Sequence, residues 1–207
     1  MSRRQRTLAA VAIGCASSLA YAATIDSLDV TRAHGRYSLV ANAHLEATSE
    51  SIYTVLVDYG EDHFSRISSA YKESGFLEPA EDGTPIVYTK MEGCLLFHCM
   101  TFNRVERLET EKPTLIRSIV LPGQSNFKYS VSEWKLESDG DGGTNLVYTL
   151  EMEPDFWIPP LIGPWYLKRT LSQGGVRAVS RIERLARELD GLPLGPPIPL
   201  GGGNPSQ

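Results

Sequence analysis

The clearest hydrophobic pattern in the chain lies near its C-terminus, between residues 167 and 190. Apolar or small residues recur there every three or four positions, which places them on one face of a helix; they are Leu167, Leu171, Gly174, Gly175, Ala178, Ile182, Leu185 and Leu189. The charged residues Lys168, Arg169, Arg177, Arg181, Arg184 and Glu188 fall on the other face. A helix of about 24 residues is roughly 36 Å long, enough to cross about seven strands. We therefore expect one long helix packed across a sheet.

The expected helix contains two glycines and follows a segment rich in aromatic residues and prolines. Gly174 and Gly175 each cost about 1 kcal/mol relative to alanine, so they predict a close approach of the helix backbone to another element. The alternative is a kink, or a helix that begins only at Val176. The segment before the helix, residues 156–166, is aromatic and interrupted by prolines, so it cannot be one regular helix. We expect it to cover an apolar surface, either the interior or a ligand or membrane.

The preceding chain reads as strands joined by turn-rich links, which is typical of antiparallel neighbours. A capped helix from Thr48 or Ser49 to Gly60, and a short one after Asp62, interrupt the strands. The expected strands are Ser27–Arg32, Tyr37–Leu45, Ala70–Glu78, Thr84–Glu92, Cys99–Leu108, Leu115–Leu121, Phe127–Glu137 and Thr144–Met152. This order predicts an α+β fold with helices on one side of a curved antiparallel sheet.

The first 22 residues have the pattern of a secretory signal peptide, with three arginines, a short apolar run and small residues before Ala23. We expect cleavage after Ala22, which would make the protein periplasmic. A lipoprotein anchored at Cys15 is the weaker alternative, because Ala12 lies where such signals usually carry leucine. One domain, residues 23–190, is expected to follow, with a disordered tail of residues 191–207 rich in glycine and proline.

Charge limits the choice of partner. Loss of residues 1–22 removes three arginines and no acidic residue, so the formal net charge changes from −5 to −8. An acidic domain of this kind is a poor binder of nucleic acid, which requires a basic surface. No apolar run of 18 residues remains, so we expect a soluble or peripherally attached protein. We also expect it to be a monomer.

Cys94 and Cys99 remain after cleavage. On one continuous strand they would lie about 16 Å apart on opposite faces, too far for a disulfide. A four-residue loop, Leu95–His98, would make them cross-strand neighbours that can pair. An oxidising compartment favours this disulfide, and two free thiols are the alternative.

Three segments carry a resemblance to a known superfamily. YSLVANAHLEATSESIYTVLVDYGEDHFSRISS (residues 37–69), with Asp58-Tyr59 at the helix end, resembles the opening of the START-like (SRPBCC) superfamily of polyketide cyclases, plant lipid-binding allergens and coenzyme-Q-binding START domains. MEGCLLFHC (91–99) and EPDFWIPPLIGPWYLKR (153–169) are similar to segments of exported bacterial members. The resemblance covers about residues 25–190. It implies a helix-grip fold, in which a curved sheet wraps around the C-terminal helix and leaves an apolar cavity between them.

Strand alternation then gives the candidate ligand-binding residues. They are Val87, Phe102, Arg104, Arg117, Ile119, Phe127, Tyr129, Tyr148 and Leu150, with Trp157 and Trp165 at the mouth. An arginine on a packed face needs a carboxylate, phosphate or carbonyl partner, so Arg104 and Arg117 stand out. Solvent exposure of both is the alternative.

No motif for catalysis accompanies these residues. The sequence contains no His/Cys metal spacing, nucleophile elbow, P-loop or dinucleotide fingerprint, so we expect no catalytic residue, metal or cofactor. We expect non-catalytic binding or transport of a hydrophobic small molecule such as a lipid, quinone or polyketide. One alternative is a cyclase or dehydratase acting on a polyketide-like substrate, which a tyrosine or histidine beside a carboxylate in the cavity would favour. Another is an envelope interaction module that contacts a membrane or a protein partner through Leu95, Leu96, Phe97 and Phe156–Tyr166.

Overall fold

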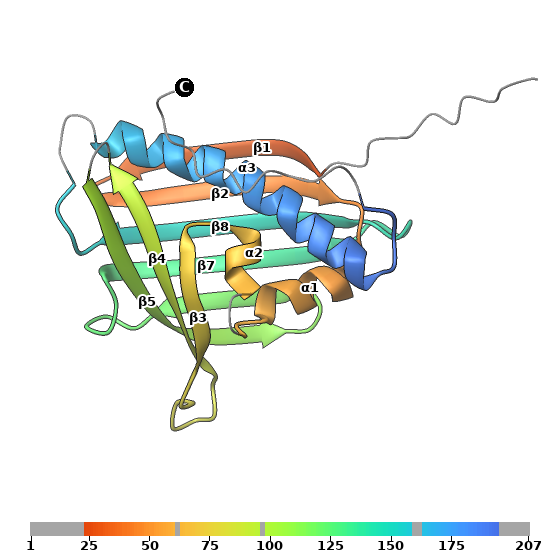
Figure 1. Cartoon of the computed structure of the whole chain (residues 1–207), viewed down its shortest axis with the longest axis horizontal. Coiled ribbons are helices and arrows are strands. Elements are labelled where there is room, and N and C mark those ends of the chain that lie inside the picture. The colour runs from red at the N-terminus through yellow and green to blue at the C-terminus, as the bar shows by residue number, and fades with distance from the viewer. Residues whose placement is uncertain (1–22, 61–62, 96–97, 159–162, 195–207) are drawn as a thin grey trace, which may run out of the picture.

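The computed structural model describes residues 23–60, 63–95, 98–158 and 163–194, and in them one sheet is covered on one face by helices (Figure 1). The elements are β1 (Thr24–Ala33), β2 (Arg36–Leu45), α1 (Ser49–Val57), α2 (His63–Ile67), β3 (Tyr71–Leu77), β4 (Ile86–Leu95), β5 (His98–Glu111), β6 (Leu115–Val120), β7 (Phe127–Ser138), β8 (Thr144–Pro154) and α3 (Gly163–Leu189). The expected signal peptide and residues 195–207 of the expected tail lie outside the described residues.

The sheet is antiparallel throughout, in the order β1-β2-β8-β7-β6-β5-β4-β3. Pairing of β2 with β8 brings the first hairpin beside the last strand. The β1–β2 turn is tight because His34 and Gly35 both adopt a positive φ, 51° and 85°. These pairings confirm the expected α+β helix-grip fold.

α3 crosses the sheet diagonally as one continuous helix (Figure 1). It begins four residues before the expected start because Pro164 falls in the first turn, where a missing N–H costs nothing. The alternative start at Val176 is therefore wrong. A Cβ added at Gly175 would lie 3.3 Å from Leu28 Cδ1 of β1, whereas one at Gly174 meets no described atom within 4 Å. The expected close approach is confirmed at Gly175 only.

The buried stripe of α3 is wider than the pattern predicted. Arg181, expected on the solvent face, is buried and donates from Nη1 to the Ile67 carbonyl of α2 at 3.1 Å. Arg187 is also buried and donates to the carbonyls of Glu46 and Pro193 at 2.8 to 3.0 Å. Leu189, expected on the packed face, is exposed. The difference arises because α1 and α2 cover the flank of α3.

A carboxylate joins the end of α3 to the start of α1. Asp190 accepts hydrogen bonds from the Thr48 backbone N at 2.8 Å, from Thr48 Oγ1 at 2.9 Å and from the Ser51 hydroxyl. A negative charge at a helix N-terminus is also favoured by the helix dipole. Burial alone would raise the pKa of Asp190, but the hydrogen bonds from Ser51 and Thr48 outweigh it and lower that pKa.

The other end of α3 is attached to a disulfide-bonded hairpin. Cys94 on β4 lies opposite Cys99 on β5, and the two are joined by a disulfide, which confirms the expected pairing. The Tyr166 hydroxyl, near the start of α3, donates to the Cys94 carbonyl. The helix is thus attached at both ends. Leu96 and Phe97 of the hairpin loop lie outside the described residues.

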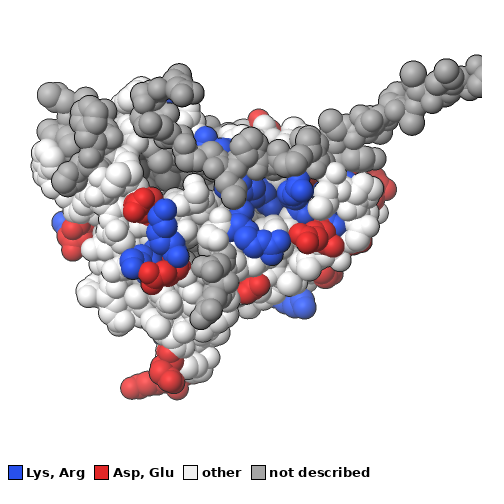
Figure 2. All heavy atoms as spheres, in the orientation of Figure 1, with Lys and Arg blue, Asp and Glu red and all other residues white. Residues whose placement is uncertain are grey.

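The surface charge is not evenly distributed. On the face that carries α3, lysine and arginine side chains gather over the middle of the molecule (Figure 2). Arg177 of α3 and Arg66 of α2 are among the exposed arginines, and Arg66 pairs with Glu188 at 3.2 Å. Among the described residues, no helix is long and apolar enough to cross a membrane.

Asp190→Asn is expected to lower the free energy of unfolding at pH 7 by about 1–3 kcal/mol, because hydrogen bonds to a charged acceptor are lost. The folded pKa of Asp190 lies below its unfolded value of about 3.9. The contribution is therefore present above about pH 4 and is lost as the pH falls through the folded pKa. Urea denaturation at pH 7 and at about pH 3 measures both effects.

The matched control is Asp155→Asn, which removes an exposed carboxylate 3.7 Å from Lys128 and should cost less than about 1 kcal/mol. Equal losses in the two variants, or a loss at Asp190 that persists unchanged in acid, would contradict this role of Asp190.

Candidate functional site

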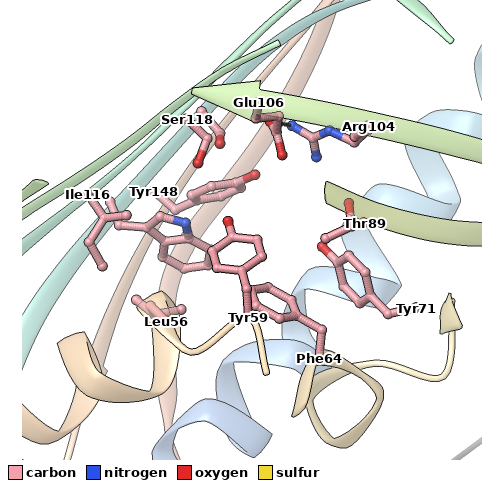
Figure 3. A pocket seen from close by; sticks show the side chains of 12 residues that line it. Leu56, Tyr59, Phe64, Tyr71, Thr89, Arg104, Glu106, Ile116, Ser118 and Tyr148 are labelled. Carbon is pink, nitrogen blue, oxygen red and sulfur yellow. Dashed lines mark hydrogen bonds and ion pairs between the residues drawn. The ribbon is translucent and has the colours of Figure 1, made fainter. Parts of the chain in front are cut away.

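A small cavity lies between the sheet and the segment that contains α1 and α2. Its wall comes from both sides and consists of Leu56, Tyr59, Phe64, Tyr71, Thr89, Arg104, Glu106, Ile116, Ser118, Ser132, Trp134 and Tyr148 (Figure 3). The volume of about 50 Å³ is far below the several hundred Å³ of ordinary small-molecule sites. It corresponds to a few water molecules.

The position of the cavity differs from the one expected beneath the C-terminal helix. The packed side of α3 is occupied by apolar core, because Val179, Ile182, Leu185 and Ala186 pack tightly with α1 and the sheet. The described helical part of the cavity wall comes instead from α1, α2 and Tyr59 between them.

A buried ion pair forms one side of the cavity. Arg104 and Glu106 are two residues apart on β5, so they point to the same face of the sheet. Arg104 Nη2 lies 2.6 Å from Glu106 Oε1, and the two side chains are only 12% and 4% exposed. Arg104 also donates to Ser130 Oγ at 3.2 Å, and its guanidinium lies 5.7 Å from the Phe127 ring centroid. Burial alone would lower the pKa of Arg104. Glu106 and the nearby tyrosines raise that pKa by more than burial lowers it, so the side chain stays cationic.

Three tyrosines face this ion pair, and their hydroxyl groups point toward it (Figure 3). Burial raises the pKa of Tyr59, Tyr71 and Tyr148 above its usual value, and the charge of Glu106 adds to the rise. All three are therefore neutral O–H groups at physiological pH, able to donate hydrogen bonds. They are unsuited to act as bases.

Two polar atoms of the wall lack a partner. Thr89 Oγ1 and Arg104 Nε are buried and make no hydrogen bond within the described part of the chain. Nearly all buried polar groups in proteins are hydrogen-bonded, and an unpaired one costs about 1–3 kcal/mol. The cavity wall is therefore suited to a bound group that can form hydrogen bonds.

The structure brings two of the expected ligand-binding residues to this cavity. Arg104 and Tyr148 line it. Val87 lies on the same sheet face but packs into the core beside α1. Phe102, Phe127 and Leu150 form part of a second apolar cluster, together with Val30, Tyr37, Leu39, Ala41, Val120 and Met152.

The remaining candidates do not line the cavity. Arg117 and Ile119 alternate with the cavity residues Ile116 and Ser118, so they lie on the other face of β6. Arg117 is half-exposed and pairs with Glu109 at 3.6 Å.

Tyr129 on β7 also faces away from the cavity, and its ring lies 4.1 Å below the Arg36 guanidinium. Trp157 and Trp165 are 76% and 64% exposed.

Of the residues shortly before α3, Phe156 is partly buried and Trp157 is exposed. Phe156 stacks on Phe102 with centroids 4.9 Å apart and meets Phe127 edge-on at 6.0 Å. Residues 159–162 lie outside the described residues. Membrane contact through this segment and the Leu95–Phe97 loop stays a prediction.

Several cavity residues escaped the sequence analysis. Glu106 had a usable signal, because it follows Arg104 by two positions within one expected strand. Tyr59 belongs to the Asp58-Tyr59 pair that ends the expected helix. Thr89, Ser118 and Ser132 had no such signal, because serine and threonine occur on both the buried and the exposed face of a strand.

No group of three or more His, Cys, Asp and Glu residues that could hold a metal ion occurs in the part of the chain that the structure describes. The polar groups of the cavity are one carboxylate, one guanidinium, several hydroxyls and the indole N–H of Trp134. The chemistry available there is hydrogen bonding and charge stabilisation.

Several solved structures have a fold similar to that of this chain. The Zhui aromatase/cyclase from Streptomyces sp. R1128 matches with a TM-score of 0.58 at 14% identity, over 74% of this chain and 96% of that one. A START superfamily protein from Mycobacterium smegmatis matches with 0.56 at 15% identity (73% and 98%), and human STARD10 with 0.55 at 9% (79% and 76%). No protein-family model and no curated protein sequence matches the chain. The chain therefore has a START-like (SRPBCC) fold, as the sequence resemblance implied.

Breaking the buried ion pair should destabilise the protein strongly. Arg104→Met leaves Glu106 as an unpaired buried charge and is expected to cost about 3–5 kcal/mol, whereas replacing both residues with Arg104→Met and Glu106→Leu should cost less. Urea denaturation of the single and double variants measures the difference.

The control is Arg117→Met, which breaks the half-exposed pair with Glu109 and should cost less than about 1 kcal/mol. A double variant that is less stable than Arg104→Met would show that the two charges are not coupled as the geometry requires.

Proposed function

We propose that this protein binds a small organic molecule reversibly, with a polar group of the ligand held by the cavity and its apolar body held beside Phe102 and Phe127. The observation that carries the proposal is the buried wall of Arg104, Glu106 and three tyrosine hydroxyls, in which Thr89 Oγ1 and Arg104 Nε lack partners among the described residues. A purely structural core of this size would place apolar side chains there, because burying charges is costly.

The small volume implies that the cavity enlarges when it binds. Tyr148 packs against both apolar clusters, so it lies at the border between the cavity and the Phe102–Phe156 stack. In this proposal, the apolar body of the ligand takes the place of Phe156 beside Phe102 and Phe127. The polar group then lies at Arg104 and Glu106, and the Phe156 side chain moves aside to admit the ligand.

The fold supports the same class of function. START-like neighbours include an aromatase/cyclase and START-superfamily proteins, which makes a hydrophobic or polyketide-like molecule the first choice of ligand. The disulfide between Cys94 and Cys99 supports an oxidising compartment. Together with the sequence of residues 1–22, it motivates the proposal that the protein acts in the periplasm as a carrier.

Catalysis of the cyclase or dehydratase kind is the second candidate. It is favoured by the three neutral tyrosine hydroxyls that face Arg104 and Glu106. Donors of this kind can polarise a carbonyl group as negative charge develops on its oxygen. Turnover of a polyketide-like substrate that Tyr59→Phe/Tyr148→Phe abolishes, with binding retained, would favour the enzyme over the carrier.

The tryptophans provide a direct binding test. The chain contains three, of which Trp134 lines the cavity while Trp157 and Trp165 are exposed. A Trp157→Phe/Trp165→Phe variant therefore reports on the cavity alone. Titration with menadione, a neutral quinone that quenches indole emission, should give a saturable loss of Trp134 fluorescence.

The matched control is Trp134→Phe, which keeps the two exposed tryptophans and should show only unsaturable collisional quenching. Native mass spectrometry of gently purified protein should also show a bound organic mass. Unsaturable quenching of Trp134, together with consistently empty protein, would overturn the proposed function.

A further inference from the structure

We infer that the cavity selects neutral ligands whose polar group both donates and accepts hydrogen bonds, such as a phenol or an enolised ketone, and that Glu106 excludes anions. This inference rests on the proposed function and specifies the ligand class of the same site. It follows from the composition of the wall and the position of its two charges.

The charges of the cavity wall disfavour a bound anion. Arg104 is the only cationic side chain in the described wall, and its charge is already balanced by Glu106 at 2.6 Å. An anion in the cavity would be attracted by Arg104 and repelled by Glu106 from nearly the same distance. The attraction and the repulsion would nearly cancel, so nothing would offset the free energy lost when the anion leaves water. A neutral ligand avoids this cost.

The cavity wall offers both donors and acceptors of hydrogen bonds. Arg104 Nε can only donate, and Thr89 Oγ1 can both donate and accept; neither has a partner in the described residues. The Glu106 carboxylate accepts, and the tyrosine hydroxyls can donate as well as accept. A hydroxyl group bonded to an unsaturated carbon offers one donor and one acceptor, so it satisfies both kinds of wall atom.

Aromatic rings border the cavity on two sides. The rings of Trp134 and Tyr148 lie with centroids 4.0 Å apart, and Tyr59 and Phe64 lie 4.6 Å apart on the helical side. Aromatic side chains on two sides of a narrow space favour a flat ligand, which they contact through their faces and edges. The site therefore suits a planar ring that carries a hydroxyl group.

The experiment compares phenol with benzoate, which have similar rings and differ in charge at neutral pH. Isothermal titration should show that the wild-type protein binds phenol and not benzoate. Glu106→Gln keeps an acceptor oxygen for Arg104 but removes the negative charge. Its affinity for benzoate should rise on the order of 100-fold, as expected for removing a like charge about 6 Å away at an effective dielectric constant of about 20.

Two variants control this result. Arg104→Gln/Glu106→Gln removes both charges and should lose the gain in benzoate binding. Glu109→Gln removes a carboxylate that pairs with Arg117 outside the cavity and should leave benzoate binding at the wild-type level. Circular dichroism and thermal melting show whether each variant is folded.

A test on the wild-type protein avoids dependence on any variant. 4-Nitrophenol ionises near neutral pH with a change of colour, so preferential binding of its neutral form should raise its apparent pKa when the protein is in excess. An unchanged or lowered pKa, equal binding of benzoate and phenol by the wild type, or no gain in folded Glu106→Gln would each overturn the inference and leave ligand binding intact. Absence of binding of phenol, 4-nitrophenol and menadione alike would instead contradict the proposed function.

Discussion

The buried ion pair between Arg104 and Glu106 is the constraint around which the interior is arranged. Both side chains come from one face of one strand, with a contact of 2.6 Å. Charges in this position require polar neighbours. The sequence supplies them as serines on β6 and β7 and as the hydroxyls of Tyr71 on β3, Tyr148 on β8 and Tyr59 between α1 and α2. The middle of the sheet therefore stays polar and incompletely filled, between two apolar clusters.

The helices are positioned around this centre by contacts at the two ends of α3. Asp190 joins the end of α3 to the start of α1 through Thr48 and Ser51. Tyr166 joins its beginning to the disulfide hairpin at Cys94. Between these attachments the C-terminal part of α3 is closely packed. The α1–α2 segment borders the cavity. Phe156 borders the cluster that contains Phe102 and Phe127.

Much of the fold could be predicted from local patterns. Alternation and turn residues located the strands, the three-and-four spacing located α3, and the loop between Cys94 and Cys99 indicated their disulfide. Arg181 and Arg187 were harder, because their burial depends on carbonyls of α2 and on the chain near Glu46. The cavity wall was likewise only partly predictable, because some of its residues meet only through contacts between segments that are distant in the sequence. Arg104 and Tyr148 followed from alternation, whereas Tyr59, Tyr71 and Thr89 meet them only through the tertiary fold.

The central claim is that the space beside Arg104 and Glu106 is a ligand site and not merely a defect in packing. A crystal structure of the protein with phenol tests it most directly. The account predicts a ring between Trp134 and Tyr59, with its hydroxyl oxygen within hydrogen-bonding distance of Glu106 or Arg104. Phenol found only at the surface, with the cavity wall unchanged and the ion pair enclosed by side chains, would contradict it.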